Sequence, residues 1–202
     1  MIALRRVTKA FAGRVVLEDL TLELPDGTVT ALIGPTGSGK TTAGRLFLGL
    51  SAPDSGTVVG TVGIRRAAVF QDERLCPQLT AVENVGLVLP GRSPTSVVTD
   101  SLLSVGLDRL SLARPARVLS GGQRRLVALV RGLLAPAELV VLDEPFTNLD
   151  STVKSLALAW TRRQLAGRTA LLITHEPDEA RRLDACVVPL TSPNPRPPTP
   201  EH

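Results

Sequence analysis

Residues 34–41 form a glycine-rich segment whose composition and spacing suit the binding of phosphate. They read Gly-Pro-Thr-Gly-Ser-Gly-Lys-Thr and fit the pattern G-x-x-x-x-G-K-[ST]. Glycines let backbone N–H groups turn inward around an anion, and a helix that follows adds its positive N-terminal end. Lys40 would bring a charge to the outer phosphates, and Thr41 would offer a hydroxyl to Mg²⁺. The segment therefore predicts a nucleoside triphosphate site, against the alternative of a flexible loop with an incidental lysine.

A second candidate group is a pair of carboxylates that ends an apolar run. Residues 139–144 read Leu-Val-Val-Leu-Asp-Glu, which predicts a buried strand with Asp143 at the carboxyl edge of a sheet. From there Asp143 could hold Mg²⁺, directly or through water. Glu144 points elsewhere because side chains alternate along a strand, and it could polarise an attacking water. The alternative is two solvated acids at a strand end, which the glycine-rich segment argues against.

Residues 120–123, Ser-Gly-Gly-Gln, form a third candidate group. A serine followed three residues later by a glutamine has the form of a capping box, so a helix is predicted to begin here. Two glycines in the first turn would leave backbone N–H groups open to an approaching anion. The chain thus contains a second phosphate-binding helix start, about 80 residues after the first.

Strands that alternate with helices are predicted to position these groups. Apolar runs that suit buried strands occur at residues 28–33, 67–70, 139–142, 170–173 and 185–190. Helical spacing occurs at residues 42–50, 120–134 and 151–165. This alternation predicts an α/β fold with a mainly parallel central sheet. Period-two alternation at residues 19–24 and short strands at 52–63 predict antiparallel β structure, and helical spacing at 80–89 and 93–107 predicts a helical lobe.

Composition narrows the class of protein. The chain has 202 residues and a formal net charge of +4, which suits one domain and is too mild to indicate a nucleic-acid partner. No apolar run reaches the roughly 20 residues of a membrane helix, and the first residues do not resemble a secretory signal. Cys76 and Cys186 are expected to be free thiols in a reducing compartment. The proline-rich residues 191–202 are expected to be disordered.

The sequence Leu-Ser-Gly-Gly-Gln at residues 119–123, together with the glycine-rich segment, makes the chain resemble the nucleotide-binding subunit of ABC (ATP-binding cassette) transporters. The resemblance covers residues 1–190 and implies one ABC ATPase domain of the P-loop NTPase fold, with an antiparallel β subdomain and the helical lobe inserted at about residues 72–118. In the family's order, residues 34–42 match Walker A, 119–123 the signature, 139–144 Walker B and 148–150 the D-loop. Gln71 matches the Q-loop, His175 the switch histidine, and Phe11 an adenine-stacking aromatic residue.

The resemblance implies a role for each matching residue. The residues expected to contact ATP are Phe11, Gly34, Pro35, Thr36, Gly37, Ser38, Gly39, Lys40, Thr41, Thr42, Ser120, Gly121, Gly122, Gln123 and Asp150. The residues expected to hold Mg²⁺ are Thr41, Gln71 and Asp143, and those expected to act in catalysis are Lys40, Gln71, Glu144 and His175. Two alternatives stay open: Phe11 as a core residue, and His175 as a core or helix-capping residue.

The resemblance also implies partners and a location. Two copies of the chain, or one copy and a paralogous ATPase subunit, would form a head-to-tail dimer that encloses two ATP molecules. Each ATP would face residues 120–123 of the other subunit. Membrane-spanning permease subunits would be separate chains, and an extracytoplasmic solute-binding protein could join them. The chain would lie in the cytoplasm on the inner face of the cell membrane and would bind no nucleic acid.

The type of transporter is indicated by residues 69–85, which look most like the small importer subunits of the nitrate, sulfonate and taurine group. Residues 76–80 read Cys-Pro-Gln-Leu-Thr, where that group usually has Leu-Pro-Trp-Leu-Thr. Import of a solute is therefore expected. Two alternatives are a soluble ABC ATPase in DNA repair or translation, which usually carries two cassettes or long insertions, and a P-loop small-molecule kinase, which would not need residues 119–123.

Overall fold

The computed structural model describes residues 1–91 and 95–191 and contains a five-stranded sheet whose paired strands are all parallel. Its strands, in the order in which they lie side by side, are β5 (Arg66–Val69), β6 (Leu139–Asp143), β7 (Thr169–Thr174), β3 (Val29–Ile33) and β8 (Cys186–Pro189). All five strands overlap the apolar runs expected to form a buried sheet, so the predicted α/β fold with a parallel sheet is confirmed.

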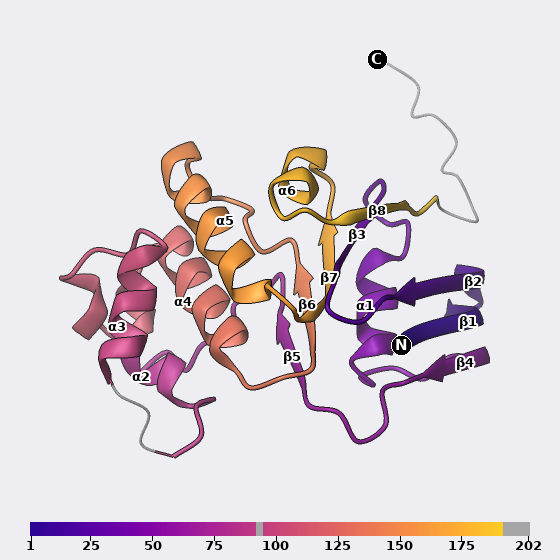
Figure 1. Ribbon diagram of the computed structural model, residues 1–202, viewed down its shortest axis with the longest axis horizontal. Coiled ribbons are helices and arrows are strands. Elements are labelled where there is room, and N and C mark those ends of the chain that lie inside the picture. Colours follow the sequence, from indigo (N-terminus) through magenta and orange to yellow (C-terminus); the bar gives the residue numbers. More distant parts are fainter. Residues whose placement is uncertain (92–94, 192–202) are drawn as a thin grey trace.

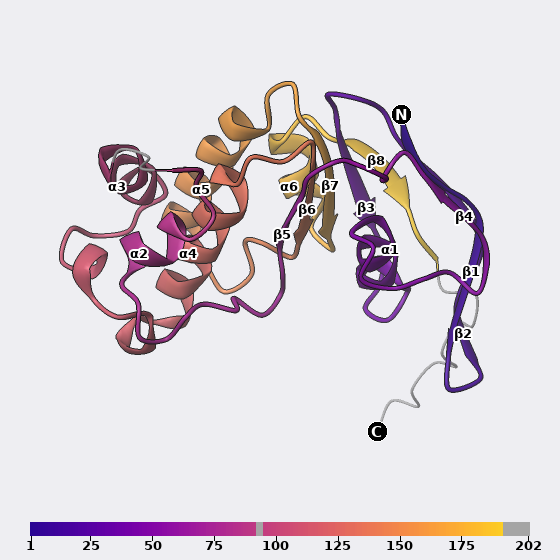
Figure 2. The same cartoon turned by 90° about the horizontal axis from the view of Figure 1, so that it is seen from below.

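The two faces of this sheet are covered by different elements, because alternate residues of each strand point to opposite sides. On β6, Val140 and Leu142 pack in one core cluster with α4 (Gly121–Leu134) and α5 (Ser151–Leu165). Leu139 and Val141 pack in the other cluster with α1 (Lys40–Phe47). Figures 1 and 2 show α4 and α5 on one side of the sheet and α1 on the other. The central sheet is therefore buried on both faces.

A separate antiparallel sheet covers the outer side of α1 and has the order β2-β1-β4 (Figure 2). Its strands are β1 (Ile2–Phe11), β2 (Arg14–Leu24) and β4 (Ser55–Val59). The alternation predicted at residues 19–24 is confirmed, since Leu22 and Leu24 are buried and Thr21 and Glu23 are exposed. The prediction missed β1 and the first residues of β2, because irregular pairing between β1 and β2 interrupts the period-two pattern.

The helical lobe contains α2 (Ala81–Gly86), α3 (Thr95–Ser104) and two single turns of 3₁₀ helix at Ser111–Ala113 and Ala116–Val118. Val85 and Leu102 of the lobe share a core cluster with Leu126 of α4. In Figure 2 the lobe lies at the opposite end of the molecule from the antiparallel sheet. Of the predicted helix at 93–107, residues 93 and 94 lie outside the described part. The proposed division into a domain at 1–190 and a lobe at 72–118 stays a prediction.

The two long helices lie where helical spacing was predicted at residues 120–134 and 151–165, and each begins at a capping residue. Ser120 begins α4 and Asp150 begins α5, each with a side-chain oxygen that accepts hydrogen bonds from backbone N–H groups of the first turn. Helix α6 (Pro177–Arg182) was missed because it is short. Among the described residues, no helix is both long and apolar enough to cross a membrane. The disorder predicted for residues 191–202 concerns a stretch that, apart from its first residue, lies outside the described part.

Candidate nucleotide site

The predicted site residues come together because four neighbouring strands of the parallel sheet end at the same edge. Residues 34–39 follow β3, and Gln71 comes two residues after the end of β5. Asp143 is the last residue of β6, and His175 directly follows β7. In open α/β sheets this carboxyl edge is where ligands bind. The topology thus gathers segments that are up to 141 residues apart in the sequence (from 34 to 175) at one edge.

The loop at residues 34–39 adopts a conformation that depends on its glycines. Gly37 and Gly39 have positive φ angles of 84° and 97°, a region that L-residues with side chains rarely occupy. A Cβ on Gly39 would lie 2.6 Å from Leu17 Cδ2, and a Cβ on Gly34 would lie 2.1 Å from the backbone oxygen of Leu190. The Ser38 hydroxyl is buried and has no hydrogen-bond partner in the described part of the chain. The fold of the chain therefore requires glycine at positions 34, 37 and 39.

The Lys40 ammonium is held at this loop. Its Nζ donates to the backbone oxygens of Gly34 at 2.7 Å and Pro35 at 2.8 Å. Burial lowers the pKa of Lys40, and the carboxylates of Glu144 and Asp143 act against that change. The ammonium therefore lies where a phosphate could replace carbonyl oxygens as its partner. This placement agrees with the role predicted for Lys40.

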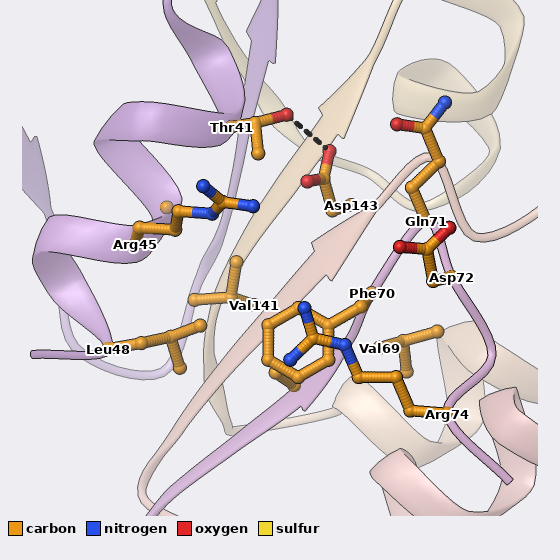
Figure 3. A pocket seen from close by; sticks show the side chains of 12 residues that line it. Thr41, Arg45, Leu48, Val69, Phe70, Gln71, Asp72, Arg74, Val141 and Asp143 are labelled. Atoms are coloured by element: carbon orange, nitrogen blue, oxygen red, sulfur yellow. Dashed lines mark hydrogen bonds between the residues drawn. The ribbon is translucent and has the colours of Figure 1, made fainter. Parts of the chain in front are cut away.

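Thr41 and Asp143 form the part of the site that suits a magnesium ion. The Thr41 hydroxyl donates to Asp143 Oδ1 at 3.2 Å, and Gln71 lies across the same pocket (Figure 3). Burial raises the pKa of Asp143, the hydrogen bond from Thr41 opposes this, and the Glu144 carboxylate adds to it. A cation at this point would remove the cost of the buried negative charge. The described residues hold no cluster of three or more His, Cys, Asp and Glu side chains suited to a metal, whereas hydroxyl, carboxylate and phosphate oxygens are the usual magnesium ligands in nucleotide sites.

Glu144 and His175 lie together at the open side of the site. Glu144 has a positive φ of 48° and its N–H donates to the oxygen of Ile173 at 2.9 Å, so the residue is fixed to β7 in a strained conformation. Its Oε1 lies 3.4 Å from His175 Nδ1, and its Oε2 accepts from the Thr147 hydroxyl at 3.5 Å. The His175 side chain is 54% exposed and does not cap α6, which begins after Glu176. The alternative that His175 is a core or capping residue is therefore wrong, and sequence analysis missed Thr147.

Phe11 ends β1 with 47% of its surface exposed, so the alternative that it is a core residue is also wrong. The Lys9 ammonium lies 5.3 Å from the centre of its ring. An exposed ring with a cation on one face retains the other face for stacking. This arrangement is compatible with the adenine contact that was predicted for Phe11.

The predicted signature segment begins α4 with the expected capping box. The Gln123 N–H donates to Ser120 Oγ at 3.2 Å, and Gln123 Oε1 accepts from the Ser120 N–H at 2.9 Å. Gln123 Nε2 also donates to Asp108 and Ser111, which ties the helix start to the lobe. Gln123 therefore has a structural role within the chain. Its predicted contact with nucleotide, and those of Ser120, Gly121 and Gly122, stay predictions.

Asp150 likewise has a role in the fold of the single chain. Its Oδ1 accepts from the N–H groups of Thr152 at 3.1 Å and Val153 at 2.9 Å, and so caps α5. Sequence analysis had assigned Asp150 to contacts across a dimer. The capping hydrogen bonds account for an aspartate at this position without a partner, so the contact across a dimer stays a prediction.

A network that sequence analysis missed supports the turn that carries His175. Thr174 Oγ1 donates to Glu179 Oε2 at 2.6 Å, and Lys154 Nζ lies 2.6 Å from Glu179 Oε1 and 2.7 Å from Glu176 Oε2. Glu179 is almost fully buried, so the ion pair with Lys154 compensates for the loss of water around its carboxylate. Lys154 belongs to α5, which Asp150 caps. The turn before α6 is therefore linked to the helix that follows the D-loop.

Comparison with known proteins identifies the family. The profile of the family described as ABC transporter matches residues 17–147. The chain belongs to the ABC transporter family. Within this family it is an ATP-binding subunit and an ATPase. The predictions of an ABC ATPase fold and of ATP hydrolysis are therefore confirmed.

Among curated relatives, the chain is 38% identical over 185 residues to the aliphatic sulfonates import ATP-binding protein SsuB 1 of Paracoccus denitrificans, with 89% of this chain and 74% of the relative covered. It is 36% identical over 194 residues to the Fe(3+) ions import ATP-binding protein FbpC of Pseudomonas fluorescens, with 88% and 55% covered. It is 38% identical over 196 residues to the sulfate/thiosulfate import ATP-binding protein CysA of Nocardia farcinica, with 89% and 59% covered. The chain thus spans about half to three quarters of these relatives, and the predicted likeness to sulfonate-type importer subunits is confirmed.

Solved structures confirm the fold. A dimeric ATP-binding cassette in a post-hydrolysis state, bound to ADP and Pi, has a TM-score of 0.82 at 24% identity, with 94% of each chain covered. A dimeric bacterial ABC transporter cassette has a TM-score of 0.81 at 26% identity, also with 94% of each chain covered. The relatives support the transporter interpretation, and they give no support to a soluble factor in DNA repair or translation.

Proposed function

We propose that ATP hydrolysis by this chain drives the import of a solute through separate membrane-spanning subunits, on the inner face of the cell membrane. The observation that carries the proposal is the convergence of Lys40, Thr41, Asp143, Glu144 and His175 at one sheet edge, in a chain whose compared relatives are named as import ATP-binding proteins. Those relatives are named for sulfonates, iron and sulfate at similar identities. Similarity therefore supports the direction of transport and does not select the solute.

In the proposed mechanism, Lys40 exchanges the carbonyl oxygens of Gly34 and Pro35 for the outer phosphates of ATP. The N–H groups of the loop at 34–39 and the start of α1 surround the same phosphates. Thr41 and Asp143 would hold Mg²⁺, with Gln71 on the far side of the pocket. When bound, the ion would neutralise charge on the phosphate oxygens. Together these groups position the terminal phosphate for in-line attack.

Glu144 is proposed to orient and polarise the attacking water. Its carboxylate lies at the exposed side of the site and is only one-fifth exposed, so its position is restricted. The neighbouring His175 imidazole and Thr147 hydroxyl hold the two carboxylate oxygens. His175, which is more exposed than Glu144, is proposed to donate a hydrogen bond to the terminal phosphate. In this proposal Glu144 acts on the attacking water and His175 acts on the terminal phosphate.

The active assembly is proposed to be a head-to-tail dimer. Ser120 and Gly121 are exposed at the start of α4, so the backbone N–H groups of this helix start can be approached by another molecule. In the proposed dimer, this helix start covers the ATP held by the other subunit. The two solved cassettes with the same fold are described as dimers, which supports the proposal. Permease subunits and, in an importer, a solute-binding protein would complete the transporter.

Sedimentation of Glu144→Gln tests the dimer. This variant should bind ATP without turnover, so with ATP and Mg²⁺ it should sediment as a dimer and without nucleotide as a monomer. The matched control is Glu144→Gln combined with Lys40→Ala, which should stay monomeric. A monomer at saturating ATP would contradict the dimer.

The transport role is tested by purification of the tagged chain from detergent-solubilised membranes of its own cells. ATPase activity should co-purify with multispanning partner chains that mass spectrometry identifies, and it should respond to the transported solute when the complex is reconstituted. Activity found only in the soluble fraction, and stimulated by nucleic acid, would contradict the transport role and favour the soluble alternative.

A further inference from the structure

An arginine of α4 is buried against the backbone of the segment that carries Gln71. The Arg125 side chain is only 6% exposed. Its Nη1 donates to the backbone oxygen of Phe70 at 2.9 Å, and its Nη2 donates to that of Gln71 at 2.5 Å. The Glu73 carboxylate lies 3.8 Å from the same guanidinium. Arg125 thus holds the two peptide groups that flank the Cα atom of Gln71.

A second arginine of α4 holds the other end of the same segment. Arg131 donates to the backbone oxygens of Glu73 at 2.8 Å and Arg74 at 2.9 Å. Arg74 has a positive φ of 48°, and its guanidinium lies 4.0 Å from the centre of the Phe70 ring (Figure 3). Four carbonyl groups between residues 70 and 74 therefore point at helix α4. Residues 70–74 are thus hydrogen-bonded to α4 at both ends of the segment.

The chemistry of arginine makes this contact specific. A guanidinium stays charged at all relevant pH values, so its burial is unfavourable unless its N–H groups find acceptors. Within the described residues, Arg125 Nε is buried without a hydrogen-bond partner. The contacts of the guanidinium with Phe70, Gln71 and Glu73 therefore have to offset the cost of its burial. The planar fork fixes the direction of both N–H donors, which a lysine ammonium cannot reproduce.

Ser120 caps α4, so Arg125 lies less than two turns from the start of the signature segment. Gln71 lines the pocket that Thr41 and Asp143 also line (Figure 3). We infer that Arg125 is a positioning residue for ATP hydrolysis: it ties Gln71 to α4, so that the Gln71 side chain is presented to the Thr41–Asp143 site only when α4 is in place. The inference rests on the proposed function and on the role that the family resemblance implies for Gln71, as a ligand of Mg²⁺ that acts in catalysis.

A double-mutant cycle tests the inference, with Gln71→Ala, Arg125→Met and the double variant in the full chain. Each single change should lower kcat about tenfold, the effect of one lost hydrogen bond to a charged group. The double variant should be no more than about twofold slower than Gln71→Ala, because Arg125 acts through Gln71. Both changes should also raise the Mg²⁺ concentration needed for half-maximal rate, and Arg125→Lys should restore part of the loss.

Arg168 provides the matched control, because it too is an arginine that donates to backbone oxygens, here of Leu133, Ala135 and Ala137. Arg168→Met should lower Tm to a similar extent as Arg125→Met while kcat and the Mg²⁺ requirement of the folded protein stay unchanged. Should Arg125→Met fail to fold, Arg125→Lys is used in the same cycle.

The outcomes separate the inference from the proposed function. If Gln71→Ala keeps the wild-type kcat, the role proposed for Gln71 is wrong and the inference falls with it. If Gln71→Ala lowers kcat but the Arg125 change multiplies that loss, to about a hundredfold in the double variant, the role of Gln71 stands and the inference is overturned. A change in Tm alone, with kcat and the Mg²⁺ requirement unaltered in Arg125→Met, would likewise overturn it.

Discussion

Replacement of Asp143 by asparagine should stabilise the nucleotide-free protein and abolish its ATP hydrolysis. Asp143 is buried, and its only side-chain hydrogen-bond partner among the described residues is the Thr41 hydroxyl, while the more distant charges of Arg45 and Lys40 offset part of the cost of its burial. Burial and the neighbouring Glu144 carboxylate raise its pKa, so the charged form is unfavourable in the folded state. Asparagine retains a carbonyl oxygen that can accept from Thr41 and removes the charge.

The sign of the pH dependence follows from the direction of this shift. Because the pKa of Asp143 is higher in the folded than in the unfolded protein, the folded state binds the proton more tightly. The contribution of Asp143 to stability therefore falls as the pH rises from the pKa of the unfolded state, about 3.9, through the pKa of the folded state. Above the pKa of the folded state the contribution stays lowered. The asparagine of the Asp143→Asn variant does not titrate, so the gain from the substitution should be largest at neutral pH and should shrink as the pH is lowered.

We expect a gain of about 1 kcal/mol at neutral pH, in the usual range for removal of one unfavourable interaction. For a domain of this size that corresponds to about 2–4 °C in Tm. Thermal unfolding without nucleotide at pH 7.5 and pH 5 measures the gain, and a coupled phosphate-release assay with Mg²⁺ measures the loss of hydrolysis. A lower Tm than wild type at pH 7.5, or a gain that is equal at both pH values, would refute the reasoning.

Three further predictions concern other parts of the chain. Lys40→Ala should weaken ATP binding about 10- to 100-fold, because it removes a charged hydrogen-bond donor, whereas Glu144→Gln should retain binding and lose turnover. Titration with a fluorescent nucleotide measures the affinity of both variants. An equal loss of affinity in the two would contradict both roles. Lys154→Met should lower the free energy of unfolding by about 3 kcal/mol, because it leaves the buried Glu179 carboxylate without its cationic partner. Urea denaturation measures the free energy of unfolding, and a midpoint equal to that of the wild type would disprove the prediction. Gly121→Ala should leave Tm unchanged or higher and yet abolish ATP-dependent dimerisation and hydrolysis, measured by sedimentation and phosphate release; wild-type activity would count against the dimer.

The sequence predicted the elements whose signals are local. Helix α5 has its predicted bounds and helix α4 begins one residue after its predicted start, because Ser120 and the spacing that follows it signal α4 and the helical spacing of residues 151–165 signals α5. Helix α6 was missed, although Pro177 in its first turn and acidic residues after it are helix-start signals, because six residues show too little periodicity. Strand β1 was missed because bulges interrupt its alternation. Period and capping are visible in a sequence, whereas irregular pairing with a neighbouring strand is not.

The candidate site divides in the same way. Lys40, Thr41, Asp143 and Glu144 could be predicted because each lies in a short segment whose composition already implies phosphate or metal chemistry. The contact of Arg125 with residues 70 and 71 could not be predicted, since it joins positions 54 and 55 residues apart through backbone oxygens that any residue type supplies. Glu179 could not be predicted either, since the fold is what brings the Lys154 ammonium of α5 and the Thr174 hydroxyl of β7 to its carboxylate. Groups that do chemistry are specified by residue type, while groups that hold them in place are specified by the fold.

The glycines of the chain show which positions serve its own fold and which leave space for another molecule. A Cβ on Gly34 or Gly39 would collide with neighbouring atoms of the same chain at 2.1 and 2.6 Å, so the single subunit needs these glycines. Outside the backbone of α4 itself, a Cβ on Gly121 would come no closer than 3.9 Å to any described atom, and one on Gly122 no closer than 3.5 Å, both without a positive φ. Alanine would fit at both positions and favours helix over glycine by about 1 kcal/mol in a helix interior. The fold of one chain thus gives no reason for two glycines at the start of α4, whereas the proposed dimer would give one, since it brings a phosphate held by the second subunit close to these positions.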